Sequence, residues 1–332
     1  MPQSSSVLAI RDLVVEIPTR AGLVRPVNGV SYDIFEGEIL GVVGESGAGK
    51  SMAGNAVIGL LDPPARIANG VIRLNGERID ALNRAEMRHV RGKRIGMVFQ
   101  DPLTSLNPLL RIGDQLTETI RAHLPLNAGA ARDRAVAALQ EVGIPAAAER
   151  LDSYPHEFSG GMRQRVVIAL ALCAEPSLLI ADEPTTALDV SVQAQIIALL
   201  KRLCRERGMA VMLVTHDMGV IAEAADRVAV MYAGSLAEIG PVADVLTHPN
   251  HPYTEGLMGS TPLASKGKSR LNQIPGAMPR PGNLPQGCAF HPRCSRAAPA
   301  CRNFAPQPMR MGPQHSVACH FPLVEQPEEA LQ

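Results

Sequence analysis

Residues 44–51 read Gly44-Glu45-Ser46-Gly47-Ala48-Gly49-Lys50-Ser51 and fit the pattern G-x-x-x-x-G-K-S. The apolar run 39–43 before them predicts a buried strand and 51–61 after them can form a helix, so the octet lies at a strand-to-helix turn. Glycines allow backbone N–H groups to close on phosphates, whose charge the helix N-terminus also favours. In such a loop the Lys50 ammonium reaches the β- and γ-phosphates and the Ser51 hydroxyl ligates Mg²⁺. The octet therefore predicts a nucleotide-binding protein.

The composition narrows the class of protein. The 332 residues allow one large domain or two smaller ones, and the 32 basic residues balance the 32 acidic ones. No basic surplus recruits nucleic acid, and the absence of Trp weakens any base-stacking surface. No signal peptide or apolar run of roughly 18 residues is present, so we expect a cytoplasmic protein. Its six cysteines are then expected to be reduced.

The chain alternates apolar runs with amphipathic stretches from residue 7 to about 245, which predicts an α/β domain with a largely parallel sheet. Strands are predicted over 13–17, 39–43, 95–99, 178–181, 211–214 and 228–232. Helices are predicted over 51–61, 130–142, 161–174, 190–207 and 218–225. Residues 102–158 predict a helical subdomain inserted in a domain that spans 1–245. Residues 246–332, here called the C-terminal extension, include a stretch too rich in Pro for a conventional core and are interpreted as an extended appendage.

A second motif is Leu178-Leu179-Ile180-Ala181-Asp182-Glu183. Four apolar residues followed by acids predict a buried strand that delivers carboxylates to the edge of the sheet where open α/β sheets bind ligands. Asp182 is placed to hold the Mg²⁺ shell, and Glu183 to polarise a water for attack on the γ-phosphate. Two solvated acids at an ordinary strand end are the alternative, which the phosphate loop upstream disfavours.

A third motif is Ser159-Gly160-Gly161-Met162-Arg163-Gln164-Arg165, which opens an apolar helix. A Ser-Gly-Gly turn at a helix N-terminus predicts a second anion site with Ser159 as the cap. A plain capped helix is the alternative. One nucleotide does not need two such turns in one subunit, unless the second serves the nucleotide of another subunit.

Together with Gln100, Thr186-Ala187-Leu188-Asp189 and His216, these motifs resemble the ATPase subunits of ABC transporters over roughly residues 8–240. The resemblance implies a P-loop NTPase fold of the ABC type, with a helical subdomain and a cysteine-containing C-terminal extension. It also implies a head-to-tail dimer. Each ATP would lie between the phosphate loop of one subunit and Ser159, Gly160, Gly161 and Gln164 of the other.

The same resemblance implies roles for three further residues. Asp189 would lie at the dimer seam, and Gln100 would sense the γ-phosphate and touch Mg²⁺ or the attacking water. His216 would contact the γ-phosphate, so that Lys50, Gln100, Glu183 and His216 form the catalytic set. Taken singly, Gln100 is as well explained as a strand-terminal Gln and His216 as a loop His. The family usually places an aromatic near Ile17 to stack on adenine; Ile17 has no π-face, and Tyr32 is considered as a substitute.

A narrower resemblance comes from residues 100–108, 154–158, 248–254 and 274–276, which look like the dipeptide/oligopeptide and nickel importer group. It implies an ATP-hydrolysing subunit that powers peptide uptake from the cytoplasmic face of the inner membrane. The implied partners are a paralogous ATPase or a second copy, two transmembrane permease subunits and an extracytoplasmic solute-binding protein. A nickel or other small-solute importer is the nearest alternative.

Two other classes are weighed against this one. A soluble ABC ATPase acting on nucleic acid or the ribosome usually has two cassettes or a long coiled coil, and this chain has neither. A regulatory module with a degenerate cassette would lack catalytic residues, whereas Lys50, Asp182, Glu183 and His216 are all present.

Four cysteines stand in the extension: Cys288, Cys294, Cys301 and Cys319. Four thiols in a Pro-rich segment suggest a metal in place of a core, and no gap between them is the two-residue spacing common in zinc sites. The residues alone leave iron–sulfur, zinc and free thiols open. The family resembled here often carries such a set, associated with a 4Fe–4S cluster.

The other histidines and cysteines receive structural interpretations. His291, His315 and His320 could replace a ligand if the metal were zinc, and we interpret them as solvated loop residues. Cys173 and Cys204 fall on apolar helix faces and are predicted to be buried thiols.

Overall fold

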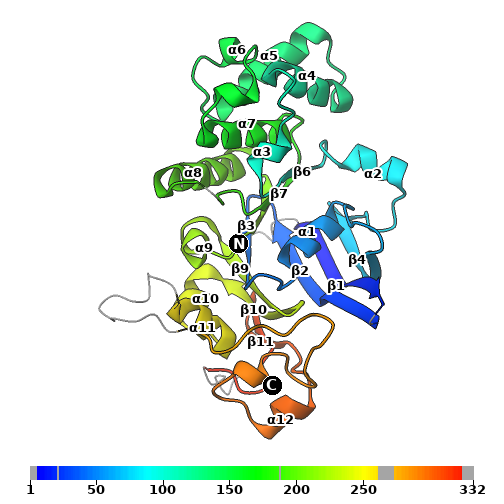
Figure 1. Ribbon diagram of the computed structural model, residues 1–332, viewed down its shortest axis with the longest axis vertical. Coiled ribbons are helices and arrows are strands. Elements are labelled where there is room, and N and C mark those ends of the chain that lie inside the picture. The colour runs from blue at the N-terminus through cyan, green and yellow to red at the C-terminus, as the bar shows by residue number, and fades with distance from the viewer. Residues whose placement is uncertain (1–5, 21, 187, 261–272, 324–332) are drawn as a thin grey trace. The chain divides into compact units, whose positions relative to one another are not determined.

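The computed structural model describes residues 6–20, 22–186, 188–260 and 273–323. The chain divides into two compact units (Figure 1). The first unit comprises Met1–Leu8, Ile34–Glu38 and Leu74–Leu213. The second comprises Ala9–Asp33, Ile39–Arg73 and Val214–Gln332.

The first unit is built on strands in the order β8-β7-β6. These are β6 (Ile95–Val98), β7 (Leu178–Asp182) and β8 (Ala210–Val214). β6 and β7 pair in parallel from Ile95 opposite Leu178 to Val98 opposite Ala181, so their carboxyl ends lie at one edge. Every residue of β7 and β8 is buried, which is typical of parallel strands covered on both faces.

Helices make up most of the rest of the first unit. They are α2 (Arg84–Val90), α3 (Pro102–Ser105), α4 (Ile112–His123), α5 (Ala128–Glu141), α6 (Ala147–Arg150), the 3-10 turn η1 (Pro155–Glu157), α7 (Gly160–Leu172) and α8 (Val190–Arg207). α4 packs on α5, and α5 on α7. Residues 102–158 thus carry several helices and no strand, and each of them is described by the structure.

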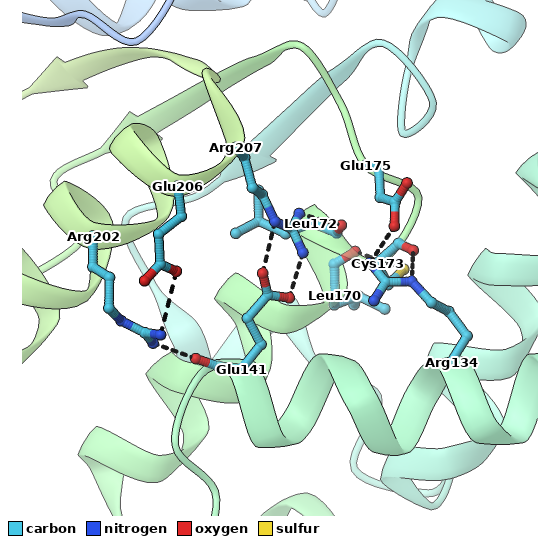
Figure 2. A network of polar contacts seen from close by, with 9 residues as sticks. All are labelled: Arg134, Glu141, Leu170, Leu172, Cys173, Glu175, Arg202, Glu206 and Arg207. Carbon is cyan, nitrogen blue, oxygen red and sulfur yellow. Dashed lines mark hydrogen bonds and ion pairs between the residues drawn. The ribbon is translucent and has the colours of Figure 1, made fainter.

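A network of charged side chains ties α5 to α8 inside this unit (Figure 2). The Arg207 guanidinium donates through Nε to Glu141 Oε1 at 2.6 Å and through Nη2 to Glu141 Oε2. Arg207 also donates to the Leu172 carbonyl oxygen at 3.2 Å, and Arg202 donates to the Glu141 carbonyl oxygen at 2.6 Å. Arg207 therefore connects the carboxylate of the last residue of α5 to the Leu172 carbonyl oxygen at the end of α7, and Arg202 adds a contact with the Glu141 backbone.

The second unit contains a sheet that the sequence analysis did not predict, with strand order β2-β1-β4. It consists of β1 (Ser6–Thr19), β2 (Gly22–Phe35) and β4 (Arg66–Leu74), drawn in blue to cyan in Figure 1; the two-residue strand β5 (Glu77–Arg78) follows β4. The predicted strand 13–17 is the middle of β1. Asp12 and Gly29 have positive φ angles of 47° and 72°, so the alternation along these long strands is interrupted and was hard to recognise.

A further set of strands in the second unit follows the order β11-β12-β10-β9-β3. It contains β3 (Ile39–Val43), β9 (Arg227–Tyr232), β10 (Ser235–Pro241), β11 (Met309–Gly312) and β12 (His315–Val317). β3 and β9 are parallel, whereas β10 is antiparallel to both β9 and β12. The C-terminal extension, interpreted from the sequence as an extended appendage, therefore contributes two strands to a sheet.

The helices of the second unit are short. They are α1 (Lys50–Val57), α9 (Met218–Ala224), α10 (Val242–Thr247), α11 (Pro252–Gly259), the 3-10 turn η3 (His291–Arg293) and α12 (Pro299–Asn303). α1 ends four residues before the predicted end at 61, because the chain turns at Gly59 with a φ of 67°. Among the described residues, no helix is long and apolar enough to cross a membrane.

Candidate functional site

The predicted phosphate loop connects β3 to α1, as the sequence pattern indicated. Gly44, Gly47 and Gly49 have φ angles of 151°, 84° and 101°, which disfavour any residue with a side chain. A Cβ atom at Gly44 would lie 2.2 Å from the Met231 carbonyl oxygen, and one at Gly49 2.1 Å from the Pro26 carbonyl oxygen. Glycine is therefore required at both positions, because the backbone at Met231 and Pro26 leaves no room for a side chain.

Lys50 is buried at the first turn of α1, and its ammonium points back into the loop. Its Nζ donates to the Gly44 carbonyl oxygen at 2.8 Å and to the Glu45 carbonyl oxygen at 3.1 Å. The cation is thus held inside the loop, where a phosphate-binding lysine must be. Ser51 follows it and is exposed, while Ser46 and Gly47 are exposed and Ala48 is buried.

His216 belongs to the same unit as this loop. Thr215 donates its N–H to the Val42 carbonyl oxygen at 3.1 Å. Val42 stands two residues before Gly44 in the chain. His216 follows Thr215 in the chain and is exposed. The second unit by itself therefore brings His216 to the end of β3 at which the phosphate loop begins.

The first unit brings together Gln100 and Glu183, which follow its paired strands β6 and β7. Gln100 Nε2 donates to Glu183 Oε2 at 2.7 Å, and Thr186 Oγ1 donates to the same oxygen at 2.9 Å. Glu183 has a φ of 47°, an uncommon conformation for a residue other than glycine. Asp182 is buried at the end of β7. This edge thus holds two adjacent carboxylates, one of them oriented by two donors.

The Ser-Gly-Gly turn and Asp189 lie at the N-termini of two helices. Ser159 Oγ accepts from the Met162 N–H at 3.3 Å, which confirms Ser159 as the cap of α7. Asp189 Oδ1 accepts from the Val192 N–H at 2.9 Å and caps α8. Ser159, Gly160 and Asp189 are exposed. These two N-termini can accept anions.

Gln164 is buried within the first unit. It is only 1% exposed, and its Nε2 has no hydrogen-bond partner among the described residues. Its contact with a nucleotide held by a second subunit stays a prediction. Gln164 lies a little over one helical turn after the exposed cap Ser159, on the buried side of α7.

The adenine side shows no aromatic face at the positions considered. Ile17 is half-buried in β1. The Tyr32 ring is buried in the core of the second unit, and burial raises the pKa of its hydroxyl. Tyr32 is therefore not available to stack on a base.

Cys288, Cys294, Cys301 and Cys319 all line one small cavity of the extension, together with Phe290 and Phe321. Cys288 donates its N–H to the Cys301 carbonyl oxygen at 2.8 Å. Burial raises the pKa of the Cys319 thiol to about 11, and the nearness of the other three cysteines adds to the rise. Within the described ranges, however, no three His, Cys, Asp or Glu side chains are arranged to hold a metal ion. The structure brings the four cysteines together without forming a metal site.

The nearby histidines are not all solvated. His315 is buried, and its Nε2 lies 2.8 Å from Glu238 Oε1, so the interpretation as a solvated residue is wrong for His315. His291 Nδ1 lies 2.9 Å from the Cys288 carbonyl oxygen, and His320 Nε2 lies 2.9 Å from the Phe304 carbonyl oxygen. These histidines have structural hydrogen bonds. Cys173 and Cys204 are fully buried, as predicted.

Tyr253 and Arg293 of the extension form hydrogen bonds with the phosphate loop and were not recognised from the sequence as part of a site. Tyr253 accepts from the Glu45 N–H at 2.9 Å, and Arg293 donates to both Glu45 carboxylate oxygens. Burial lowers the pKa of Arg293, but hydrogen bonds with Glu45 and Tyr232 more than offset this and leave the pKa raised. The only sequence signal was their position within the stretches 248–254 and 288–301.

Comparison with known proteins finds two matching family profiles and several similar chains. A family profile described as ABC transporter matches residues 27–186, and one described as oligopeptide/dipeptide transporter, C-terminal region, matches residues 237–301. The dipeptide transport ATP-binding protein DppD of Bacillus subtilis is 47% identical over 94% of this chain and 94% of that protein. The oligopeptide transport ATP-binding protein OppD of the same organism is 46% identical over 99% of this chain and 94% of that protein.

A solved structure is similar as well. It is the dimeric ATP-binding cassette MJ0796 in a post-hydrolysis state bound to ADP and Pi. It is 27% identical with a TM-score of 0.63, and the match covers 71% of this chain and 98% of that one.

Proposed function

Because the chain is an ABC ATPase that belongs to the family of ABC-transporter ATP-binding proteins including DppD and OppD, we propose that it powers the uptake of di- or oligopeptides. The observation that carries the substrate class is the match of residues 237–301 to the C-terminal region of oligopeptide/dipeptide transporters. The energy source is hydrolysis of ATP to ADP and phosphate.

ATP binds through the eight residues Gly44, Glu45, Ser46, Gly47, Ala48, Gly49, Lys50 and Ser51. The buried ammonium of Lys50 exchanges its contacts with loop carbonyl oxygens for contacts with the β- and γ-phosphates. The residues that would hold Mg²⁺ are Ser51, Gln100 and Asp182, all with oxygen donors of the kind this cation prefers. When bound, Mg²⁺ would neutralise part of the negative charge of the phosphates.

Glu183 is the general base of the hydrolysis step. Its carboxylate accepts hydrogen bonds from Gln100 and Thr186, which fix its direction. The attacking water gives a proton to Glu183 while its oxygen bonds to the γ-phosphorus, and the bond from that phosphorus to the ADP oxygen breaks. His216 donates to the γ-phosphate as charge develops there.

Two subunits bind ATP together. Ser159, Gly160 and Gly161 of one subunit face the ATP held by the phosphate loop of the other, and Asp189 lies at the seam. This part of the proposal is supported by the exposed N-termini of α7 and α8 and by the dimeric state of the MJ0796 cassette. Gln164 belongs to the same proposed site, and its side chain is 1% exposed in the single chain. The second subunit is a paralogous ATPase or another copy of this chain.

The remaining partners follow from the proposed transport function. The ATPase works at the cytoplasmic face of the membrane on two transmembrane permease subunits. An extracytoplasmic solute-binding protein delivers the peptide to the complex.

The four cysteines of the extension are proposed to hold a 4Fe–4S cluster. The donor set suits it, because four thiols from separate segments meet at one cavity closed by Phe290 and Phe321. Their present arrangement is not that of a metal site, so loading requires the thiols to shift. Three of the cysteines, Cys288, Cys294 and Cys319, lie in loops, and Cys301 lies in the short helix α12.

The transport proposal is tested by uptake of radiolabelled dialanine in cells lacking this chain. The wild-type chain is expected to restore uptake, and the Glu183→Gln variant, produced at the same level, is not. Nickel uptake is measured in the same strains. Loss of nickel uptake with normal peptide uptake would assign the chain to nickel import, and unchanged uptake of both would refute the transport function.

The cluster proposal is tested by anaerobic purification followed by iron, sulfide and zinc analysis. Four irons per chain, lost on replacing Cys288 and Cys294 with Ser, are expected. Stoichiometric zinc without visible absorbance would replace the cluster by a zinc site, and neither metal would leave four free thiols.

A further inference from the structure

Residues 288–294, here called the cysteine-bearing turn, contact the phosphate loop through the Arg293 side chain. Arg293 ends the turn η3, directly before Cys294. Its Nη1 donates to Glu45 Oε2 at 2.8 Å and its Nη2 to Glu45 Oε1 at 2.9 Å. The Arg293 side chain is 6% exposed and that of Glu45 28%. A two-point contact of this kind fixes orientation as well as distance, which a lysine at the same position cannot do.

Arg293 is itself held by contacts that limit its freedom. Its Nε donates to the Pro275 carbonyl oxygen at 2.9 Å, and its Nη1 lies 3.4 Å from the Tyr232 hydroxyl. The guanidinium also stands 5.8 Å from the centre of the Tyr232 ring, which in turn meets the Phe290 ring edge-on. Because the guanidinium is held in place, the position of residues 288–294 constrains the position of Glu45.

Two further residues of the extension contact the same part of the loop. Tyr253 of α11 accepts from the Glu45 N–H at 2.9 Å. A Cβ atom on Gly47 would lie 3.2 Å from Met278 Cε. This methionine therefore lies against the loop at Gly47, two residues after Glu45. Residues 45–47 thus touch three separate segments of the extension, although the loop and these segments are more than 200 residues apart in the chain.

We propose that Arg293 is a positioning residue of the ATP site, which through Glu45 holds the phosphate loop ready to receive ATP. The loop needs such support because three of its residues are glycines with positive φ, and glycine loses the most freedom on ordering. When the ion pair orders the loop in advance, ATP binding no longer bears that cost. Removing the ion pair should weaken ATP binding and leave the chemical step at Glu183 little changed.

The coupling is reciprocal. If the ordered turn at 288–294 favours ATP binding, bound ATP must favour the ordered turn to the same degree. Ordering of residues 288–294 and binding of ATP then favour each other, whether or not the cysteines hold a metal.

The test compares the full-length wild-type chain with Arg293→Met, Arg293→Lys and the control Arg302→Met, which changes an exposed arginine of α12. Affinity for a non-hydrolysable ATP analogue is measured by titration calorimetry, and ATPase KM and kcat by steady-state kinetics. Arg293→Met is expected to raise Kd and KM about tenfold with kcat changed less than about twofold. Arg293→Lys should recover part of the affinity, and Arg302→Met should match the wild type.

Two further measurements separate positioning from a general loss of structure. The double variant Glu45→Gln/Arg293→Met should lose less affinity than the sum of the two single losses, because both substitutions remove the same contact. Hydrogen exchange in residues 288–294 should slow when the analogue binds to the wild type and not when it binds to Arg293→Met. An unchanged Kd in Arg293→Met, or equal losses of kcat, affinity and thermal stability in the Met and Lys variants, would overturn the proposal.

Discussion

Replacement of Glu141 by Ala is expected to destabilise the first unit through the contact drawn in Figure 2. Glu141 and Arg207 side chains are 24% and 19% exposed, so the pair is partly shielded from water. The variant removes both carboxylate acceptors and leaves Arg207 with the Leu172 carbonyl oxygen at 3.2 Å. Losing a charge-assisted pair of this kind costs about 2.5 kcal/mol.

One effect works in the opposite direction. Glu141 is the last residue of α5, and a negative charge at a helix C-terminus is unfavourable by about 0.5 kcal/mol. The net loss in free energy of unfolding is then about 2 kcal/mol. For a unit of this size this lowers Tm by about 4–8 °C.

The matched control is Glu206→Ala in the same network. Glu206 is 57% exposed and lies 3.5 Å from Arg202 one turn earlier on α8, so its loss should cost less than about 0.5 kcal/mol. Calorimetric melts of both variants and of Arg207→Met are the assay. The double variant Glu141→Ala/Arg207→Met should lose less than the sum of the single losses. A Tm decrease for Glu141→Ala no larger than that for Glu206→Ala would refute the reasoning.

Three other outcomes are expected. Glu183→Gln should lower the ATPase rate at least about 100-fold while ATP still binds, measured by phosphate release and calorimetry; a smaller loss would exclude Glu183 as the base. Burial raises the pKa of the Cys173 thiol from 9.0 to about 11, so the reactive thiolate becomes abundant only at higher pH. Alkylation of Cys173 at pH 8 should be about 100-fold slower in the folded chain than in urea, and equal rates measured by mass spectrometry would contradict its burial. Glu238→Ala should lower stability by about 3 kcal/mol, because this buried carboxylate accepts from the Asn250 and His251 N–H groups and contacts His315. Retention of the wild-type Tm would show that these groups find other partners.

Local features were predictable from the sequence because their causes are local. Residues 190–207 were predicted as a helix, and α8 has those bounds, with Asp189 as its cap and Gly208 at a φ of 63° after its end. The strand that carries Asp182 was recognised from its continuous apolar run. The strands β2, β4 and β10 were missed, since their polar residues alternate irregularly and only pairing with neighbours shows them to be strands.

The sequence by itself determined the chemistry of the phosphate loop. The spacing of its glycines and Lys50 is a property of eight consecutive residues, and a strand-to-helix turn suffices to realise it. Only the tertiary structure decided what holds that loop in place. Arg293 and Glu45 are 248 positions apart, and no local pattern relates them. They meet because the C-terminal extension pairs β12 with β10, while β9 connects β10 to β3, the strand from which the loop begins. Contacts between distant residues depend on how strands pair and side chains pack, which no short stretch of sequence specifies.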